Sequence, residues 1–67
     1  MNIYRITISA ANGFGATFDK FVRARNITTA TKLAEGVRKS EARMYLPRAR
    51  KNCRVLEVKE LGALENG

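Results

Sequence analysis

The chain has 67 residues and carries 13 Lys and Arg against 6 Asp and Glu, which gives a formal net charge of +7. A chain of this length forms one domain with a single small core, so a deep enclosed active site is not expected. Because it contains one cysteine, Cys53, and no histidine, an internal disulfide is excluded, and we expect no metal site, no cofactor and no enzyme activity.

The first predicted element covers residues 3–10, where apolar and polar side chains alternate. The residues of one parity are Tyr4, Ile6, Ile8 and Ala10. This alternation predicts a half-buried β-strand. Asn12-Gly13 follows and predicts a hairpin turn, because a type I′ turn needs positive φ at both central residues. We therefore interpret residues 12–15 as a hairpin loop and not as a phosphate-binding loop, which would lead from a strand into a helix.

The return strand is predicted over residues 16–26. Phe18, Val22 and Ala24 share one parity, and Lys20 falls in the same register. Either Lys20 lies at a strand edge, or a bulge near Asp19-Lys20 redirects the side chains. We expect the bulge, because Phe21 would otherwise be exposed.

A helix is predicted next, with Thr28 or Thr29 as its N-cap. Its apolar stripe follows helical spacing and consists of Ala30, Leu33, Ala34, Val37, Glu41 and Met44. Since Glu41 interrupts this stripe, the helix is expected to leave the core near its third turn. Leu46-Pro47 should end the helix, because the residue before a proline avoids the α region.

A charged connector is predicted over residues 48–52, and the last strand over residues 53–61. The apolar residues of this strand lie on both parities, which predicts a strand that is central, bulged or covered on both faces. Residues 61–67 are expected to form a frayed tail.

These elements predict a single α+β domain over residues 1–67, with a ββαβ order. A hairpin followed by a crossover helix gives a three-stranded sheet of order 2-1-3, with the helix packed on one face. Ile3, Thr7, Phe21 and Val55 are then expected on the uncovered face. An uncovered face with apolar residues indicates a partner surface and is compatible with a homodimer.

Charge is concentrated in residues 38–54, which we call the basic segment. It holds seven of the thirteen Lys and Arg and one acid, Glu41, so its net charge is +6. The helix macrodipole accounts for Lys39 and Arg43 in the last helical turn, but it does not account for the cations that follow. The alternative to a binding surface is a merely solvated face. We favour a surface for a polyanionic or acidic partner, because arginine pairs bidentately with phosphate and carboxylate.

The candidate binding residues are the seven cations of the basic segment and one tyrosine: Arg38, Lys39, Arg43, Tyr45, Arg48, Arg50, Lys51 and Arg54. Tyr45 could stack on a nucleic-acid base, but packing against the sheet is the favoured interpretation. The neighbouring cations could lower the pKa of Cys53, although we expect a buried small hydrophobe. The acids are interpreted as surface ion-pair partners, with Glu35 pairing to Lys39.

Two stretches carry a resemblance to known proteins: VRARNITTATKLAEG, residues 22–36, and CRVLEVKEL, residues 53–61. Their order and spacing resemble small accessory proteins of phages and mobile elements, including anti-CRISPR proteins and phage inhibitors of host polymerase. The resemblance implies a non-enzymatic protein that binds a host nucleoprotein complex and blocks it. Several such inhibitors are acidic mimics of nucleic acid, whereas this chain is basic, so it would bind nucleic acid or an acidic protein face instead.

No signal peptide and no membrane span are recognisable in the sequence, so we expect a cytoplasmic protein with no membrane partner. The first functional hypothesis is an anti-CRISPR-like inhibitor that binds a host nucleic-acid-handling complex through the basic segment. The second is a stand-alone DNA- or RNA-binding protein with little sequence specificity.

Overall fold

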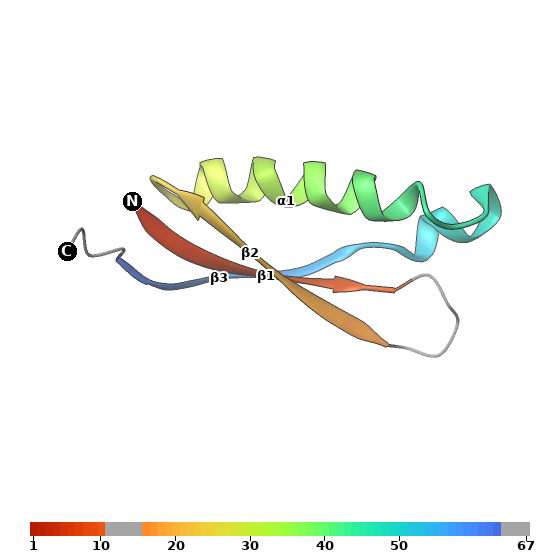
Figure 1. Cartoon of the computed structure of the whole chain (residues 1–67), viewed down its shortest axis with the longest axis horizontal. Helices are drawn as coiled ribbons and strands as arrows, with labels where there is room; N and C mark the ends of the chain where they lie inside the picture. Colours follow the sequence, from red (N-terminus) through yellow and green to blue (C-terminus); the bar gives the residue numbers. More distant parts are fainter. Residues whose placement is uncertain (11–15, 64–67) are drawn as a thin grey trace.

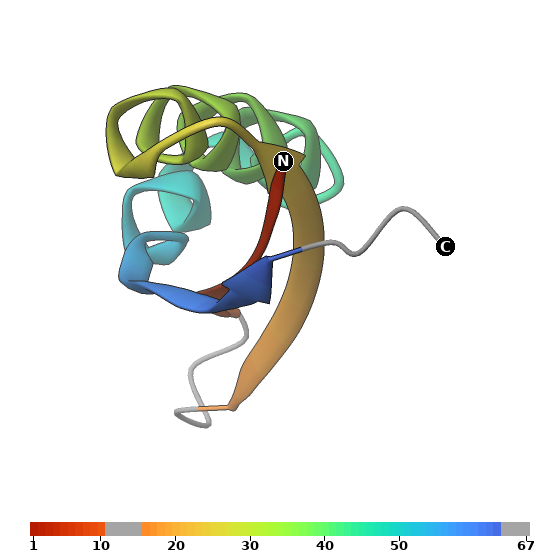
Figure 2. The ribbon, with the colours of Figure 1, turned by 90° about the vertical axis from the view of Figure 1, so that its left-hand side faces the viewer.

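The computed structural model describes residues 1–10 and 16–63 and contains three strands, one α-helix and one 3-10 helix. The elements in chain order are β1 (Asn2–Ser9), β2 (Thr17–Ala24), α1 (Ile27–Ala42), η1 (Pro47–Asn52) and β3 (Val55–Ala63). The sheet has the order β2-β1-β3, and β1 is antiparallel to both neighbours. The helix α1 covers one face of this sheet (Figures 1 and 2). The predicted α+β fold, its element order and its strand order are therefore all confirmed.

The hairpin between β1 and β2 is regular. The Ala10 N–H donates to the Ala16 carbonyl at 2.9 Å, and the register then runs without a shift to the pair of Asn2 and Ala24. The bulge predicted near Asp19-Lys20 is therefore wrong, and Phe21 is 63% exposed. The predicted turn at residues 12–15 lies outside the described residues.

β3 is the irregular strand of the sheet. Its register against β1 shifts twice, between Ile3 and Tyr4 and between Thr7 and Ile8. Each shift leaves one residue of β3 without an opposite partner, Leu61 in the first case and Leu56 in the second, as in a β-bulge. The bulges explain why apolar residues occur on both parities, and they confirm one of the three predicted alternatives for this strand.

The bulges also decide which residues of β3 face the helix. Val55 pairs with Ile8, and both belong to the core beneath α1, so the prediction that Val55 lies on the uncovered face is wrong. Ile3, Thr7 and Phe21 have the parity opposite to the buried Ile8 and lie on the uncovered face as predicted. The strand continues to Ala63, so residues 61–63 are not a frayed tail, and residues 64–67 lie outside the described part.

The ends of α1 differ from those that the sequence predicts. The N-cap is Asn26, whose side-chain oxygen accepts a hydrogen bond from the Thr29 N–H at 2.9 Å. Neither Thr28 nor Thr29 has this role. The helix ends at Ala42, well before Pro47, and tight turns follow directly. Pro47 instead begins η1, where the missing N–H of proline costs nothing. The predicted connector over residues 48–52 is thus a 3-10 helix.

The core is small and rich in alanine. Its buried members are Tyr4, Ile6, Ile8, Ala24, Ala30, Ala34, Ala42 and Cys53. The alanines of α1 contribute only methyl groups to the contact with the sheet, and the larger side chains of Tyr4, Ile6 and Ile8 on β1 fill the space between them. Two residues of the predicted helical stripe are exposed instead, Leu33 by 41% and Met44 by 77%. Met44 lies beyond the last helical residue, so the helical spacing no longer applies to it. In the described part of the chain, no helix is long and apolar enough to cross a membrane.

Candidate polyanion-binding site

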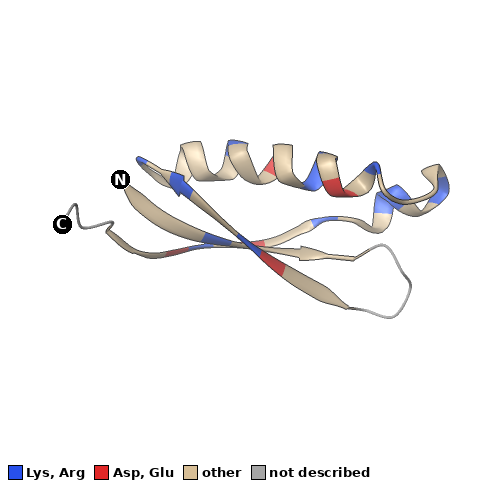
Figure 3. Cartoon of the chain, in the orientation of Figure 1, with Lys and Arg blue, Asp and Glu red and all other residues tan. Residues whose placement is uncertain are grey.

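The basic segment occupies one end of the molecule. It runs from the last turns of α1 through η1 to the residue before β3. Figure 3 shows Lys and Arg positions on the last turns of α1 and over the turns at this end, with others in the opposite half of the molecule. The fold holds the segment at both ends. Its first residues belong to α1. At its other end, the Arg54 N–H donates to Ser9 Oγ at 3.0 Å and the Arg54 carbonyl accepts from the Ser9 N–H at 2.9 Å.

Arg38 is largely a structural residue. Its Nε lies 3.2 Å from both carboxylate oxygens of Glu35, and its Nη1 donates to the Cys53 carbonyl at 3.5 Å. These contacts join α1 to the segment that leads into β3. The predicted pairing of Glu35 with Lys39 is wrong, because the carboxylate pairs with Arg38 instead.

Arg50 is the second structural cation. Its Nε donates to the carbonyls of Ala42 and Tyr45, both at 3.0 Å. The Ala42 carbonyl belongs to the last turn of α1, where carbonyls have no partner within the helix. Arg50 therefore caps the C-terminus of α1 from η1 and places a positive charge at the negative end of the helix dipole.

The other five cations of the basic segment make no such contacts with the residues that the structure describes. They are exposed and form no ion pair with any residue that the structure describes: Lys39, Arg43, Arg48, Lys51 and Arg54. They come from α1, η1 and the adjoining turns, so the fold gathers them on one end of the molecule. These five residues, here called the free cations, form the candidate site for an anionic partner.

Tyr45 is placed beside the free cations but turns toward the core. It is half-buried and packs against the cluster that contains Ile8, Ala42 and Cys53. A ring held in this way has limited surface left for stacking on a base. The placement agrees with the packing interpretation of Tyr45.

Cys53 behaves as a buried hydrophobe. It is 1% exposed, and burial raises the pKa of its thiol above the ordinary value. The Arg38 charge lowers this pKa and the Glu41 charge raises it, but both act less strongly than burial. The alternative of a lowered pKa is therefore wrong, because the neighbouring Lys51 and Arg54 point into solvent while the thiol does not.

The acids are distributed over the molecule in separate contacts. Glu41 pairs with Lys20 at 3.7 Å and Glu57 with Arg5 at 3.3 Å, and Asp19 accepts from Thr7 Oγ1 at 2.9 Å. Among the described residues, no three His, Cys, Asp or Glu side chains come together as metal ligands would.

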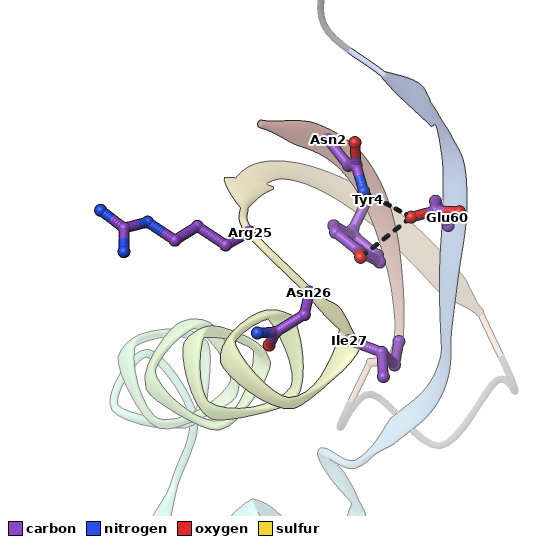
Figure 4. Close-up of a pocket in the computed structure, with 6 residues that line it drawn as sticks. All are labelled: Asn2, Tyr4, Arg25, Asn26, Ile27 and Glu60. Atoms are coloured by element: carbon purple, nitrogen blue, oxygen red, sulfur yellow. Dashed lines mark hydrogen bonds between the residues drawn. The ribbon is translucent and has the colours of Figure 1, made fainter.

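A pocket of about 440 Å³ lies at the other end of the molecule, between the start of α1 and β3 (Figure 4). It is lined by Asn2, Tyr4, Arg25, Asn26, Ile27 and Glu60. The Glu60 carboxylate accepts from Asn2 Nδ2 at 2.7 Å and from the Tyr4 hydroxyl at 3.1 Å, while the Arg25 side chain points away from Glu60. Sequence reasoning missed this pocket, because its residues come from three distant segments that only the strand order brings together.

Comparisons with known proteins add no family to this description. No family model matches the chain, and neither a curated protein nor a solved structure matches it. The class that the fold and the candidate site define is therefore a small α+β domain with five free cations at one end.

Proposed function

We propose that the protein is a non-enzymatic binding module that attaches to a host nucleic-acid-handling complex through the free cations and inhibits it. The resemblance to phage and mobile-element inhibitors, anti-CRISPR proteins among them, implies binding to a host complex that blocks it, and the free cations are the surface that this chain would use. The observation that supports the proposal is the gathering of Lys39, Arg43, Arg48, Lys51 and Arg54 on one end of the fold without an acidic partner among the described residues.

The physical reason is the cost of concentrating like charges. Like charges at one end of a small domain repel one another, and an anionic partner reduces that repulsion when it binds. Three of the five free cations are arginines, whose planar guanidinium pairs with two oxygens of a phosphate or a carboxylate at once. The counter-surface is therefore the nucleic-acid backbone or an acidic protein face of the complex.

A second candidate function is stand-alone binding to DNA or RNA. The free cations offer contacts to phosphates, which carry no sequence information. Tyr45 is turned toward the core, so the segment lacks an exposed aromatic platform among its described residues. This combination favours binding with little sequence specificity.

A charge-reversal experiment tests the binding surface. The double variant Arg48→Glu and Lys51→Glu should abolish capture of the complex from host lysate and its inhibition. The matched control reverses two exposed cations elsewhere, Arg25 and Lys32, which changes the net charge by the same amount. Arg50 must be left in place because it caps α1. If both double variants retain capture and inhibition, the free cations are not the docking surface.

Salt dependence separates stand-alone nucleic-acid binding from docking on an acidic protein face. A stand-alone binder that uses all five free cations should lose about 500-fold in affinity for labelled duplex DNA between 50 and 200 mM salt, since each phosphate contact contributes about 0.9 to the slope. An inhibitor that binds an acidic protein face should not bind free DNA or RNA at low salt, but it should still be captured with the complex.

A further inference from the structure

The two edges of the sheet differ in a way that bears on association. β3 carries two bulges and Gly62, whose φ of +146° is a conformation that residues with a side chain rarely adopt. An edge interrupted in this way is a poor template for another strand. β2 forms the opposite edge, is regular over all eight residues, and has no described element beside it (Figure 2).

The backbone of β2 presents a row of unpaired groups. The bond from the Ala10 N–H to the Ala16 carbonyl fixes the phase of the ladder between β1 and β2. In an antiparallel ladder, alternate residues direct both backbone groups to one neighbour. The even-numbered residues of β2 therefore point toward β1, and the N–H and C=O groups of Asp19, Phe21 and Arg23 point outward.

The side chains of β2 are complementary to themselves. When two copies pair antiparallel about a two-fold axis at Phe21, each Phe21 lies opposite its counterpart. Asp19 of each copy then lies opposite Arg23 of the other. A shift of two residues along the strand loses this match, because it places Lys20 opposite Lys20 of the second copy or Val22 opposite Val22.

We infer that β2 is a homodimer interface, in which two copies pair antiparallel through β2 about Phe21 and form a continuous six-stranded sheet. Each of the three outward residue pairs exchanges two backbone hydrogen bonds. The aromatic pair and the two ion pairs stabilise this register.

The groups that the interface requires are accessible in the monomer. Phe21 is 63% exposed, and Arg23 is exposed without an ion-pair partner among the described residues. Asp19 uses Oδ1 to accept from Thr7 at 2.9 Å, which leaves Oδ2 for a guanidinium. The inference does not depend on the proposed function, because β2 contains none of the free cations.

Charge exchange tests the partner and the register together. In solution the wild-type protein should show a monomer–dimer equilibrium by sedimentation. Asp19→Arg or Arg23→Asp alone places like charges opposite each other twice, which should raise the dimer dissociation constant at least about tenfold. The double variant with both changes should recover the dimer, and an equimolar mixture of the two single variants should form a heterodimer.

Disulfide trapping gives a second readout that does not depend on charge. Hydrogen-bonded partners in an antiparallel pair have Cα atoms about 5.5 Å apart, a separation that a disulfide can span. Phe21→Cys should therefore form a covalent dimer under mild oxidation. The matched control, Arg23→Cys, should not, because the introduced cysteines would be four residues apart along the strands.

Two results would overturn the inference. One is a wild-type protein that sediments as a monomer up to millimolar concentration. The other is equal cross-linking of Phe21→Cys and Arg23→Cys, which would indicate random collisions of the two thiols. Circular dichroism of each variant confirms that the fold is retained, and a variant that fails this check is replaced by Asp19→Asn, which removes the ion pair without introducing a like charge.

Discussion

Lys20 of β2 and Glu41 of α1 are paired, with 3.7 Å between Lys20 Nζ and Glu41 Oε1. Each residue alone contradicts the pattern of its element, because Lys20 occupies an apolar parity and Glu41 interrupts an apolar stripe. Together they form an ion pair at the rim of the contact between helix and sheet, where the side chains are 48% and 22% exposed. The Lys20 ammonium also lies 5.8 Å from the centre of the Phe18 ring.

This pair predicts a measurable coupling. Lys20→Met should destabilise the fold by about 1 kcal/mol, because it leaves the less exposed Glu41 carboxylate without its partner. Adding Glu41→Leu should recover about half of this loss, since two apolar residues can pack at the same rim. A double-mutant cycle measured by urea unfolding should give a coupling of about 0.5 kcal/mol. Additive effects of the two changes would show that the ion pair contributes nothing.

The cap at the C-terminus of α1 predicts that two neighbouring arginines differ in their effect on stability. Arg50→Ala should lower the free energy of unfolding by about 1–1.5 kcal/mol, because the Ala42 and Tyr45 carbonyls lose a charged donor. Arg48→Ala, two residues away on η1, should change it by less than about 0.5 kcal/mol. Urea unfolding of both variants measures the difference, and equal effects would exclude the cap.

The N-terminus of α1 gives a similar comparison. Asn26→Ala should cost about 1 kcal/mol of stability, whereas Asn26→Asp should be close to neutral, because aspartate caps as well as asparagine. Thr28→Ala is the control, since Thr28 is exposed and does not cap the helix. Thermal unfolding followed by circular dichroism distinguishes the three variants. A larger loss at Thr28 than at Asn26 would contradict the observed cap.

Burial of Cys53 predicts a dependence of stability on alkaline pH. The pKa of the thiol is raised in the folded protein, whereas in the unfolded chain it is about 8.5. Above this pH the unfolded chain releases a proton that the folded protein keeps, so stability should fall as pH rises toward the folded pKa. The slope reaches at most about 1.4 kcal/mol per pH unit.

Unfolding free energies measured between about pH 7.5 and pH 9.5 give this slope. Cys53→Ala is the control and should remove the slope, although the variant itself is less stable. A wild-type protein whose stability is constant over this range would contradict the assignment.

The fold was predictable because its strongest signals are local and agree with one another. Alternation in residues 3–10, the Asn12-Gly13 dipeptide and the helical spacing of Ala30 and Ala34 each depend on near neighbours in the sequence. The order of these elements then leaves one simple sheet topology with a covering helix. The limits of the helix were not predictable, because Asn26, Thr28 and Thr29 are all good caps and tertiary packing chooses among them.

The errors in the strands and in the site have a common physical cause. A single sequence does not show which residue lies opposite another, so the pattern predicts a bulge at Lys20, whereas in the structure Lys20 has a partner on α1. In the same way, the sequence does not separate Arg38 and Arg50 from the other cations of the basic segment. Only the fold brings the Glu35 carboxylate to Arg38 and two carbonyls to Arg50. The concentration of charge was visible in the sequence, whereas its division into structural and free cations was not.

The bulges of β3 limit how large an assembly of this protein can become. A sheet with two straight edges can add copies at both ends without limit and grow into a fibre. Here each copy offers one straight edge, β2, and one interrupted edge, β3. Association through β2 would pair the straight edge of one copy with that of the other and would leave the interrupted strand β3 at each side of the described sheet. We therefore expect growth to stop at two copies and not to continue into a fibre.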